Sequence, residues 1–478
     1  MQPINLIFAL VLLAIPAALG QGLPDLGDVS QSEMSPLQER RIGESVMREI
    51  RADPSYSDDP EITEYLNSLG NKLVAASLDS RQEFNLFLIR DPQVNAFALP
   101  GGFIGVNSGL LLTAQSESEL AGVLAHEIGH VVQRHFARML AAQKGFQLTS
   151  LAVLAIAILA ARSNSQISQA AIAGAQASYD QSSLNFTRAN EQEADRVGFQ
   201  ILENSGFDPQ GMATFFGRML RATRFSDTAA PSYLRTHPLT TDRIADMENR
   251  AQNLPYHQVP DSIEFQLMRA KLKAAQDSPR EAVEFFEDSL KERKFLSEAA
   301  SRYGLVSALI RVKAYPRALQ ELQALRKLVP TSPIVETLAA RLYAAAGNNV
   351  TALQTYRDAL RNYPGHRALV YDYADALLRN RQPEEALKLV ESRMQYTTSD
   401  YRLYQLQAKC YAALDKRLPQ HRALAEAYYR LGNLQAAIEQ LLLAQKSGDG
   451  DFYQLSSVDA RLRELRLIEE DARREGRK

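Results

Sequence analysis

The stretch LAGVLAHEIGHVV, residues 120–132, carries the motif that decides the fold of the first half of the chain. Side chains four residues apart lie one above the other on an α-helix, so His126 and His130 can present imidazole nitrogens to one cation. Glu127 would stand beside that cation, where it can take a proton from water. Imidazole and carboxylate ligands in a tetrahedron with one open position suit Zn²⁺. The alternative, two histidines on an ordinary helix, is disfavoured because unpaired polar groups among such apolar neighbours are costly.

A third ligand is expected from the acidic run NEQEADR, residues 190–196. Glu191 and Asp195 are one helical turn apart and share a face, whereas Glu193 points elsewhere. We assign Glu191 to the metal. Asp195 would then accept the free ring N–H of His126 or His130 and fix its tautomer. The alternative for this run alone is a solvated helix face, and the upstream HExxH motif decides against it.

The hydrophobic pattern around these motifs predicts a mixed domain. Apolar residues recur with a helical period in four segments, residues 36–51, 60–77, 117–142 and 188–206. Residues 84–89 and 102–106 are typical of short strands, and NAFALPGG, residues 95–102, lies between them. We therefore predict an α+β domain over residues 21–254 that is mostly helical and contains a small sheet.

The second half of the chain repeats with a period of 34 residues. The repeat appears in the pairs that begin at Ala318, Ala352 and Ala386, and Pro330 and Pro364 keep the same spacing. This is the period of the tetratricopeptide (TPR) helix-turn-helix, in which a small residue lets two helices approach closely. A further unit at residues 427–433 is displaced by half a period, and an irregular unit surrounds Ala282. We predict an all-α TPR solenoid over residues 262–478, after a boundary between Pro255 and Pro260.

Composition excludes several classes of protein. The chain has 478 residues, 45% of them hydrophobic, and a formal net charge of -2. The near-neutral charge provides no basic field for nucleic acid, so we expect no nucleic-acid partner. The single cysteine, Cys410, excludes an intramolecular disulfide and a thiolate zinc cluster.

The N-terminal residues predict export. Residues 3–19 carry no charge, residues 4–15 form an apolar core, and Ala18 and Gly20 are the small residues that a signal peptidase reads. We expect a signal peptide over residues 1–20 and a mature chain from Gln21. The alternative, a retained membrane anchor, is disfavoured because the apolar stretch is short for a span of ~20 residues.

Four motifs together resemble a known family. HEIGH (126–130), EQEAD (191–195), NAFALPGG (95–102) and THPLTTDRI (236–244) are similar to the gluzincin metallopeptidases related to HtpX and the CAAX prenyl proteases. The resemblance implies a zincin-like fold and one Zn²⁺ per chain, with His126, His130 and Glu191 as ligands and Glu127 as catalytic base. It also implies that residues 95–102 form the sheet edge that receives an extended substrate. The transmembrane helices of the membrane-embedded relatives are missing from this sequence.

The ligand set implies a mechanism. Zinc lowers the pKa of its bound water to about 7, and Glu127 takes the proton and passes it to the leaving amine. His237 and Arg243 are the candidates for donating to the oxyanion. A second hypothesis places His237 in the open zinc position, where it holds the enzyme inactive until substrate displaces it. The alternative is a loop histidine that precedes a proline.

An apolar segment, residues 151–161, separates the two halves of the site. It is too short to span a bilayer. One interpretation is a buried core helix. The other is a flap over the cleft, residues 148–178, that makes peripheral contact with the membrane surface or with client strands.

The resemblance, the export signal and the repeats lead to one functional hypothesis and one alternative. We expect a periplasmic zinc endopeptidase that degrades misassembled or stalled outer-membrane β-barrel proteins, with the TPR domain docking clients or the β-barrel assembly machinery. The alternative is a TPR chaperone or adaptor whose proteolysis is gated or secondary. The intact Glu127 argues against a pure scaffold, which has no need of a base beside two zinc-spaced histidines.

Overall fold

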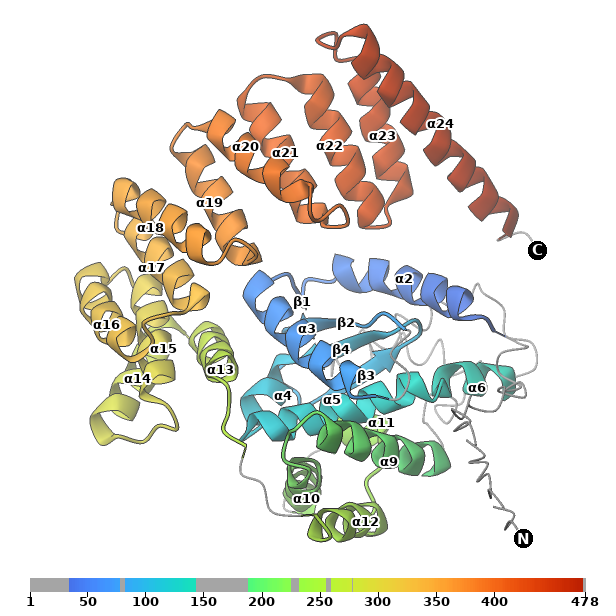
Figure 1. Ribbon diagram of the computed structural model, residues 1–478, viewed down its shortest axis with the longest axis vertical. Coiled ribbons are helices and arrows are strands. Elements are labelled where there is room, and N and C mark those ends of the chain that lie inside the picture. Colours follow the sequence, from blue (N-terminus) through green and yellow to red (C-terminus); the bar gives the residue numbers. More distant parts are fainter. Residues whose placement is uncertain are drawn as a thin grey trace, which may run out of the picture.

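The computed structural model describes residues 34–77, 82–142, 188–224, 232–254, 259–276 and 278–475 (Figure 1). Within them, an N-terminal half (residues 34–254) combines a sheet with helices, and a helical array (residues 263–475) curves around it. This confirms the predicted fold class of an α+β domain followed by helical repeats. The expected signal peptide, residues 1–20, and the apolar segment, residues 148–178, lie outside the described residues.

A four-stranded mixed sheet stands at the centre of the N-terminal half. Its strands are β1 (Tyr56–Ser57), β2 (Asn85–Ile89), β3 (Ala96–Leu99) and β4 (Phe103–Asn107), in the order β1-β2-β4-β3. β2 and β4 run parallel, and β3 runs antiparallel to β4 with Ala98 opposite Ile104. Gly101 and Gly102 make the turn between β3 and β4 at φ values of 74° and 82°, where other residues would be strained. Among the described strands β3 pairs only with β4, so it forms one edge of the sheet.

Helices cover both faces of this sheet. α2 (Pro36–Ala52) packs on one face, where Met47 and Ile50 contact Phe87. α3 (Pro60–Ala75) and α5 (Glu117–Val132) pack on the other face, where Leu86 and Leu88 point because side chains alternate along a strand. The short α4 (Ser108–Thr113) connects β4 to α5. One side of α5 is thus packed against the sheet.

A second group of helices packs on the far side of α5. It consists of α6 (His135–Ala142), α9 (Arg188–Asn204), α10 (Gln210–Arg224), α11 (Ser232–Thr236) and α12 (Thr241–Gln252). α9 approaches α5 closely because both carry glycine at the crossing. A Cβ added at Gly198 would lie 2.9 Å from the backbone of Ala125, and one at Gly129 would lie 2.9 Å from the carbonyl oxygen of Ala194. This contact brings the acidic run on α9 against the histidines of α5.

One prediction about this region was wrong. The sequence predicted a single helix over residues 117–142, but the chain breaks between α5 and α6. Arg134 adopts a left-handed conformation with φ 51°, which ends the α5 hydrogen-bond ladder and redirects the chain. The break turns His135 back toward His130.

The helical array follows the predicted 34-residue period. Its helices are α13 (Ile263–Gln276), α14 (Pro279–Glu292), α15 (Glu298–Arg311), α16 (Tyr315–Leu328), α17 (Pro333–Ala345), α18 (Asn349–Asn362), α19 (Arg367–Arg379), α20 (Pro383–Met394), α21 (Tyr401–Ala413), α22 (Arg417–Arg430), α23 (Leu434–Gln445) and α24 (Phe452–Glu475). Ala318, Ala352 and Ala386 are almost completely buried where paired helices touch.

The turns between paired helices explain the half-period unit. Left-handed residues stand in the turns that follow α15, α17, α19, α21 and α22, at Lys313, Gly347, Arg381, Asp415 and Gly432. The first four are 34 residues apart and the last interval is 17. α22 therefore follows one such turn and precedes the next, so it is the second helix of one unit and the first helix of the following unit.

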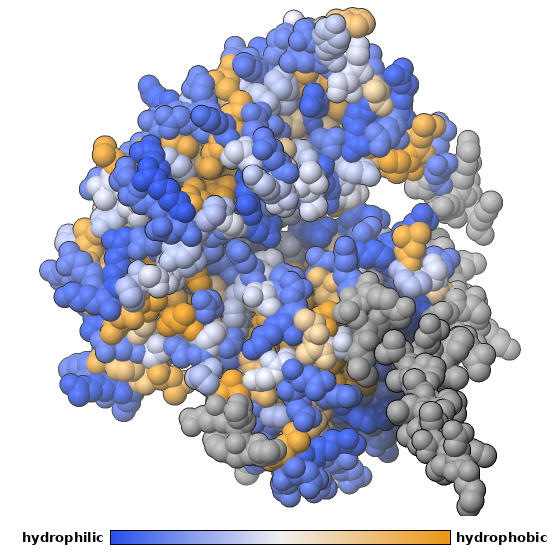
Figure 2. Space-filling view, in the orientation of Figure 1, coloured by the Kyte–Doolittle hydropathy of each residue, from blue (hydrophilic) through white to orange (hydrophobic). Residues whose placement is uncertain are grey.

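The array packs against the start of α3. The acidic segment Asp58–Glu61 supplies ion pairs from the N-terminal half. Lys271 of α13 lies 2.6 Å from Asp59 and also pairs with Glu61, and Arg402 of α21 lies 2.7 Å from Asp58. Toward its C-terminus the array leans over α2 (Figures 1 and 2), and the Arg48 side chain of α2 packs against Gly432 in the turn between α22 and α23.

None of the helices in the described part of the chain is both long and apolar enough to cross a membrane.

Candidate functional site

Four buried side chains converge in the N-terminal half. They are His126 and His130 of α5, Glu191 of α9 and His237, which follows α11, and one ligand atom from each lies within 4.8 Å of the others. His126 Nε2 is 3.0 Å from His130 Nε2. Glu191 lies 3.5 Å from His126 Nε2 through Oε2 and 3.4 Å from His130 Nε2 through Oε1. The structure thus brings together the three residues that the sequence assigns to the metal and adds His237 to them.

His237 reaches into this cluster from a separate part of the chain. Its Nδ1 lies 3.1 Å from Glu191 Oε1 and 3.4 Å from His126 Nε2, and its Nε2 lies 3.5 Å from Glu127 Oε1. The ring stacks on Tyr233, with centroids 4.7 Å apart. His237 therefore joins His126, His130 and Glu191 as a candidate metal ligand.

Tyr233 is a site residue that the sequence analysis missed. It is 1% exposed, and its ring lies between His237 and Phe216, with centroids 4.7 and 5.7 Å away. The backbone N–H of His237 donates to the Tyr233 carbonyl at 2.8 Å. The four-residue spacing of Tyr233 and His237 was the available signal, because it places both on one face of a helical turn.

Glu127 lies beside the cluster and is completely buried. Neither of its carboxylate oxygens accepts a hydrogen bond from any residue in the described ranges. A buried carboxylate without a donor is costly in a core that serves only packing. The position therefore suits a group that acts on something brought into the site.

Asp195 and Arg243 lie behind the cluster. Asp195 Oδ1 is 2.9 Å from His126 Nδ1, the ring nitrogen that points away from the other ligands. Arg243 grips Asp195 with two hydrogen bonds, from Nε at 2.6 Å and from Nη2 at 2.8 Å. Its Nη1 lies 2.9 Å from Glu191 Oε2 and donates to the Pro238 carbonyl.

This geometry corrects one expectation. Arg243 was a candidate for donating to the oxyanion, but its guanidinium is taken up by two carboxylates and a backbone carbonyl. A bidentate Arg–carboxylate pair fixes orientation as well as charge. The guanidinium of Arg243 is therefore engaged by Asp195, Glu191 and the Pro238 carbonyl, which makes Arg243 a positioning residue for the two carboxylates.

The electrostatics of the site favour a positive charge at its centre. Burial alone would lower the pKa of His126, but its contacts with Asp195 and Glu191 raise the pKa to about 9. Burial lowers the pKa of His130 well below its usual value and keeps this imidazole neutral, as a metal ligand must be. Burial opposes ionisation of Glu191, but the surrounding histidines outweigh it and hold the pKa of Glu191 well below its usual range.

These observations together test whether the residues fit a metal ion. Imidazole nitrogens and an ionised carboxylate face one another in a buried space, and the field around them favours a cation. Imidazole and carboxylate are the ligand types that zinc accepts in tetrahedral sites. The donor set therefore fits a metal.

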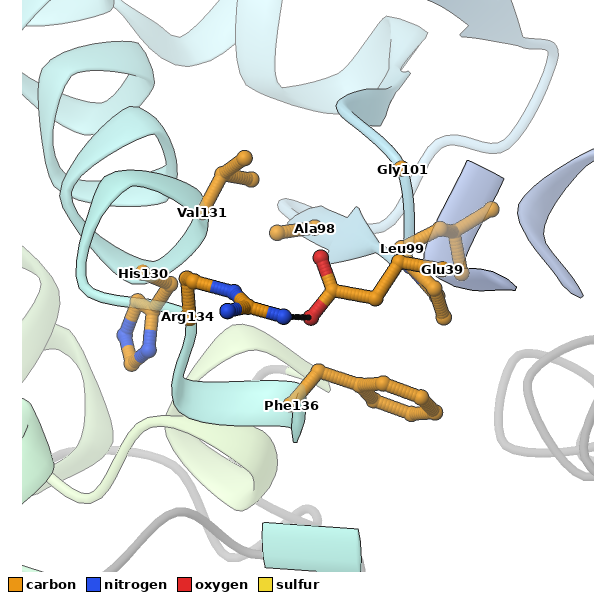
Figure 3. Close-up of a pocket in the computed structure, with 9 residues that line it drawn as sticks. Glu39, Ala98, Leu99, Gly101, His130, Val131, Arg134 and Phe136 are labelled. Carbon is orange, nitrogen blue, oxygen red and sulfur yellow. Dashed lines mark hydrogen bonds and ion pairs between the residues drawn. The ribbon is translucent and has the colours of Figure 1, made fainter. Parts of the chain in front are cut away.

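A small cavity adjoins His130 at the sheet edge (Figure 3). Its volume is about 20 Å³, which is room for little more than one water molecule or a methyl group. Ala98 and Leu99 line it from β3, and Val131 lines it from α5. The ion pair between Glu39 and Arg134, 3.1 Å long, lies across it. The cavity therefore lies between the edge strand and the metal-site helix.

Different family models match the two halves of the chain. The model of peptidase family M48 matches residues 60–251, and two models of the tetratricopeptide repeat match residues 267–333 and 343–410. The chain is 34% identical over 453 residues to the beta-barrel assembly-enhancing protease of Escherichia coli (strain K12), an alignment that covers 94% of this chain and 92% of the relative. It is 32% identical to the protein of that name in Yersinia pestis, covering 95% and 93% of the two chains.

A further relative aligns with less than half of the chain. The mitochondrial metalloendopeptidase OMA1 of Schizosaccharomyces pombe is 32% identical over 219 residues, which is 44% of this chain and 60% of the relative.

Proposed function

The chain belongs to peptidase family M48, among the beta-barrel assembly-enhancing proteases, and from this premise we propose that it is a zinc endopeptidase that acts on outer-membrane β-barrel proteins in the periplasm. We propose that it degrades barrel proteins that are misassembled or stalled. A signal peptide over residues 1–20 would be removed near Gly20. Residues 21–254 would form the peptidase and residues 262–478 the repeat domain.

One observation carries the catalytic part of this proposal. His126, His130 and Glu191 converge within bonding range of one cation, and Glu127 stands beside them with carboxylate oxygens that accept no hydrogen bond from the described residues. The candidate ligand atoms are imidazole nitrogens and carboxylate oxygens, which are the types that zinc binds. Peptide hydrolysis also needs a base next to the metal, and Glu127 is in that position.

In the proposed hydrolysis, some residues transfer protons and others hold the metal ligands in place. His126, His130 and Glu191 would hold a zinc ion, which would supply a Lewis acid for the scissile carbonyl and for water. Glu127 takes a proton from the attacking water and later delivers it to the leaving amine nitrogen. Asp195 holds the ring of His126 and is held by Arg243, so the ligand keeps its orientation during the reaction.

The sheet edge supports binding of an extended peptide. Among the described strands β3 pairs only with β4, and we propose that the client backbone pairs with the other edge of residues 96–99. A side chain of that peptide would then enter the cavity next to His130. The cavity admits only a small side chain, because its volume is about 20 Å³.

The helical array supports docking of a protein partner. TPR solenoids use their extended concave surfaces for protein contacts. We propose that the array docks the barrel client or the β-barrel assembly machinery. The second candidate function, a chaperone with gated proteolysis, is favoured by the place of His237 within the ligand group.

The test combines zinc content with cleavage of an unfolded outer-membrane β-barrel protein. We expect about one zinc per chain, cleavage by the mature protein, and loss of cleavage with retained zinc in Glu127→Gln. Glu203→Gln, the same substitution at an exposed position of α9, is the matched control and should cleave normally. Zinc binding without cleavage in the mature protein and in His237→Ala would favour the chaperone alternative, and absence of zinc would contradict the proposal.

A further inference from the structure

We propose that His135 and Glu193 form a tether that fixes the tautomer and the orientation of His130, and that they are positioning residues for the metal site. This inference rests on the proposed function, because it concerns how the chain presents a zinc ligand. Neither residue lies among the four convergent side chains.

The contacts form one continuous chain away from His130. His135 is the first residue of α6 and is completely buried. Its Nδ1 lies 2.9 Å from His130 Nδ1, and its Nε2 lies 3.1 Å from Glu193 Oε2. The two imidazole rings meet edge to face, with centroids 4.9 Å apart. His130 Nε2 points the other way, toward Glu191 and His126.

Hydrogen-bond chemistry gives this chain a direction. An ionised carboxylate only accepts, so His135 Nε2 must carry the hydrogen that is donated to Glu193. In the neutral His135 ring, Nδ1 is then an acceptor. His130 Nδ1 must therefore be the donor, which leaves His130 Nε2 with a free lone pair directed into the cluster. The tether thus selects the one neutral tautomer of His130 that can bind a metal through Nε2.

The break between α5 and α6 makes the contact. On a continuous helix, residues five positions apart lie about 140° apart around the axis, so His135 would face away from His130. The left-handed Arg134 redirects the chain and returns His135 to the ring. On the far side, Arg138 Nη1 of α6 lies 3.0 Å from Glu193 Oε2 and Nη2 donates to Asn190 of α9. Both ends of the tether are thus fixed.

His126 and His130 are oriented by different kinds of side chain. Asp195, a carboxylate gripped by Arg243, holds His126 directly. A neutral imidazole holds His130, and the charge of Glu193 acts one ring further away. Loss of His135 would therefore free the His130 ring to rotate and to adopt the other tautomer, in which Nε2 carries a hydrogen and cannot bind a metal.

The experiment measures zinc affinity and the geometry of the metal ligands. If His135 only stabilised the fold, its substitution would change neither quantity in a folded variant. The full mature chain and its variants are titrated with zinc against a chelator of known affinity, and the visible spectrum of the cobalt-substituted protein is recorded. We expect His135→Ala to bind zinc 10- to 100-fold more weakly than the mature protein, the usual range for loss of a residue that orients a ligand. We also expect an altered cobalt spectrum and a lower kcat at saturating zinc with little change in KM.

Two further variants sharpen the test. Glu193→Gln keeps an acceptor for His135 and should fall between the mature protein and His135→Ala. Gln192→Ala, at an exposed position of the same helix, is the control and should match the mature protein in zinc affinity, spectrum and cleavage. If His135→Ala does not fold, Glu193→Ala decides by the same titration, because it leaves the buried imidazole in place.

The outcomes separate the two proposals. A folded His135→Ala with unchanged zinc affinity and cobalt spectrum would overturn the tether alone. A mature protein that binds no zinc would overturn the proposed function and the tether together.

Discussion

His237 is the residue that, we propose, controls access of substrate to the site. Its Nδ1 lies 3.1 Å from Glu191 Oε1, in the group of four candidate ligands, and Tyr233 stacks on its ring. A histidine in that place would compete with substrate and water for a bound metal. At the residue scale, the gating hypothesis therefore requires that His237 be displaced before substrate can bind.

We predict that His237→Ala cleaves a short unstructured peptide faster than the mature protein at saturating zinc. The expected gain is roughly tenfold, equivalent to about 1.4 kcal/mol for removal of the competing group. His421→Ala, in the helical array, is the control. A fall in kcat instead would show that His237 serves the transition state.

At the scale of elements, the site depends on how closely α5 and α9 pack. Gly198 allows that approach, since a Cβ there would lie 2.9 Å from the backbone of Ala125 and His126. We predict that Gly198→Ala moves α9 away, separates Glu191 from the histidines and weakens zinc binding, with a loss of stability of about 1–3 kcal/mol. Zinc titration and thermal unfolding measure both effects.

The control for this packing prediction is Gln200→Ala, at an exposed position of α9. Unchanged zinc affinity in a well-folded Gly198→Ala protein would show that Glu191 tolerates displacement of its helix.

The last helix of the array is held by an ionic contact that depends on pH. Burial opposes ionisation of Glu426 of α22, but hydrogen bonds from Arg430 and from Arg461 of α24 outweigh burial and lower its pKa below the usual 4.5. Arg461 Nε lies 2.7 Å from Glu426 Oε1. Because the folded-state pKa is the lower one, the stabilisation is complete above about pH 4.5 and is lost as the pH falls through the folded-state pKa.

We predict that Glu426→Gln lowers the stability of the protein by about 1.5 kcal/mol at neutral pH. The difference in the free energy of unfolding between the unsubstituted protein and Glu426→Gln should shrink as the pH falls below the usual pKa of the Glu426 carboxyl. Chemical unfolding at a series of pH values measures it, with Glu439→Gln on α23 as the control. A difference that does not change with pH would contradict the ionic origin.

At the scale of the whole molecule, the acidic segment Asp58–Glu61 contributes ion pairs to the contact between the two halves. Glu61 has a fully buried side chain, and Lys271 and Arg341 supply its positive partners from the array. Removal of one partner from a buried ion pair leaves an uncompensated charge. The contact between the halves is therefore more sensitive to loss of one side chain than a surface ion pair would be.

We predict that Lys271→Met lowers the free energy of unfolding by about 3 kcal/mol and loosens the contact between the halves. Thermal unfolding of the variant should then show two transitions. Limited proteolysis should show faster cleavage at residues 259–262. Lys291→Met, at an exposed position of α14, is the control. Unfolding identical to that of the mature protein would show that the contact is held by apolar packing alone.

The sequence by itself determined the fold class, the period of the repeats and the relation of His126 to Glu127 and His130. These features are local, because the pitch of one helix places residues that are close in sequence. Only the tertiary structure decided the rest. It placed His237 in the ligand group, engaged Arg243 with two carboxylates and turned His135 back to His130 through the left-handed Arg134. These contacts depend on backbone breaks and on helices that meet from distant parts of the chain, and no pattern of local periodicity encodes them.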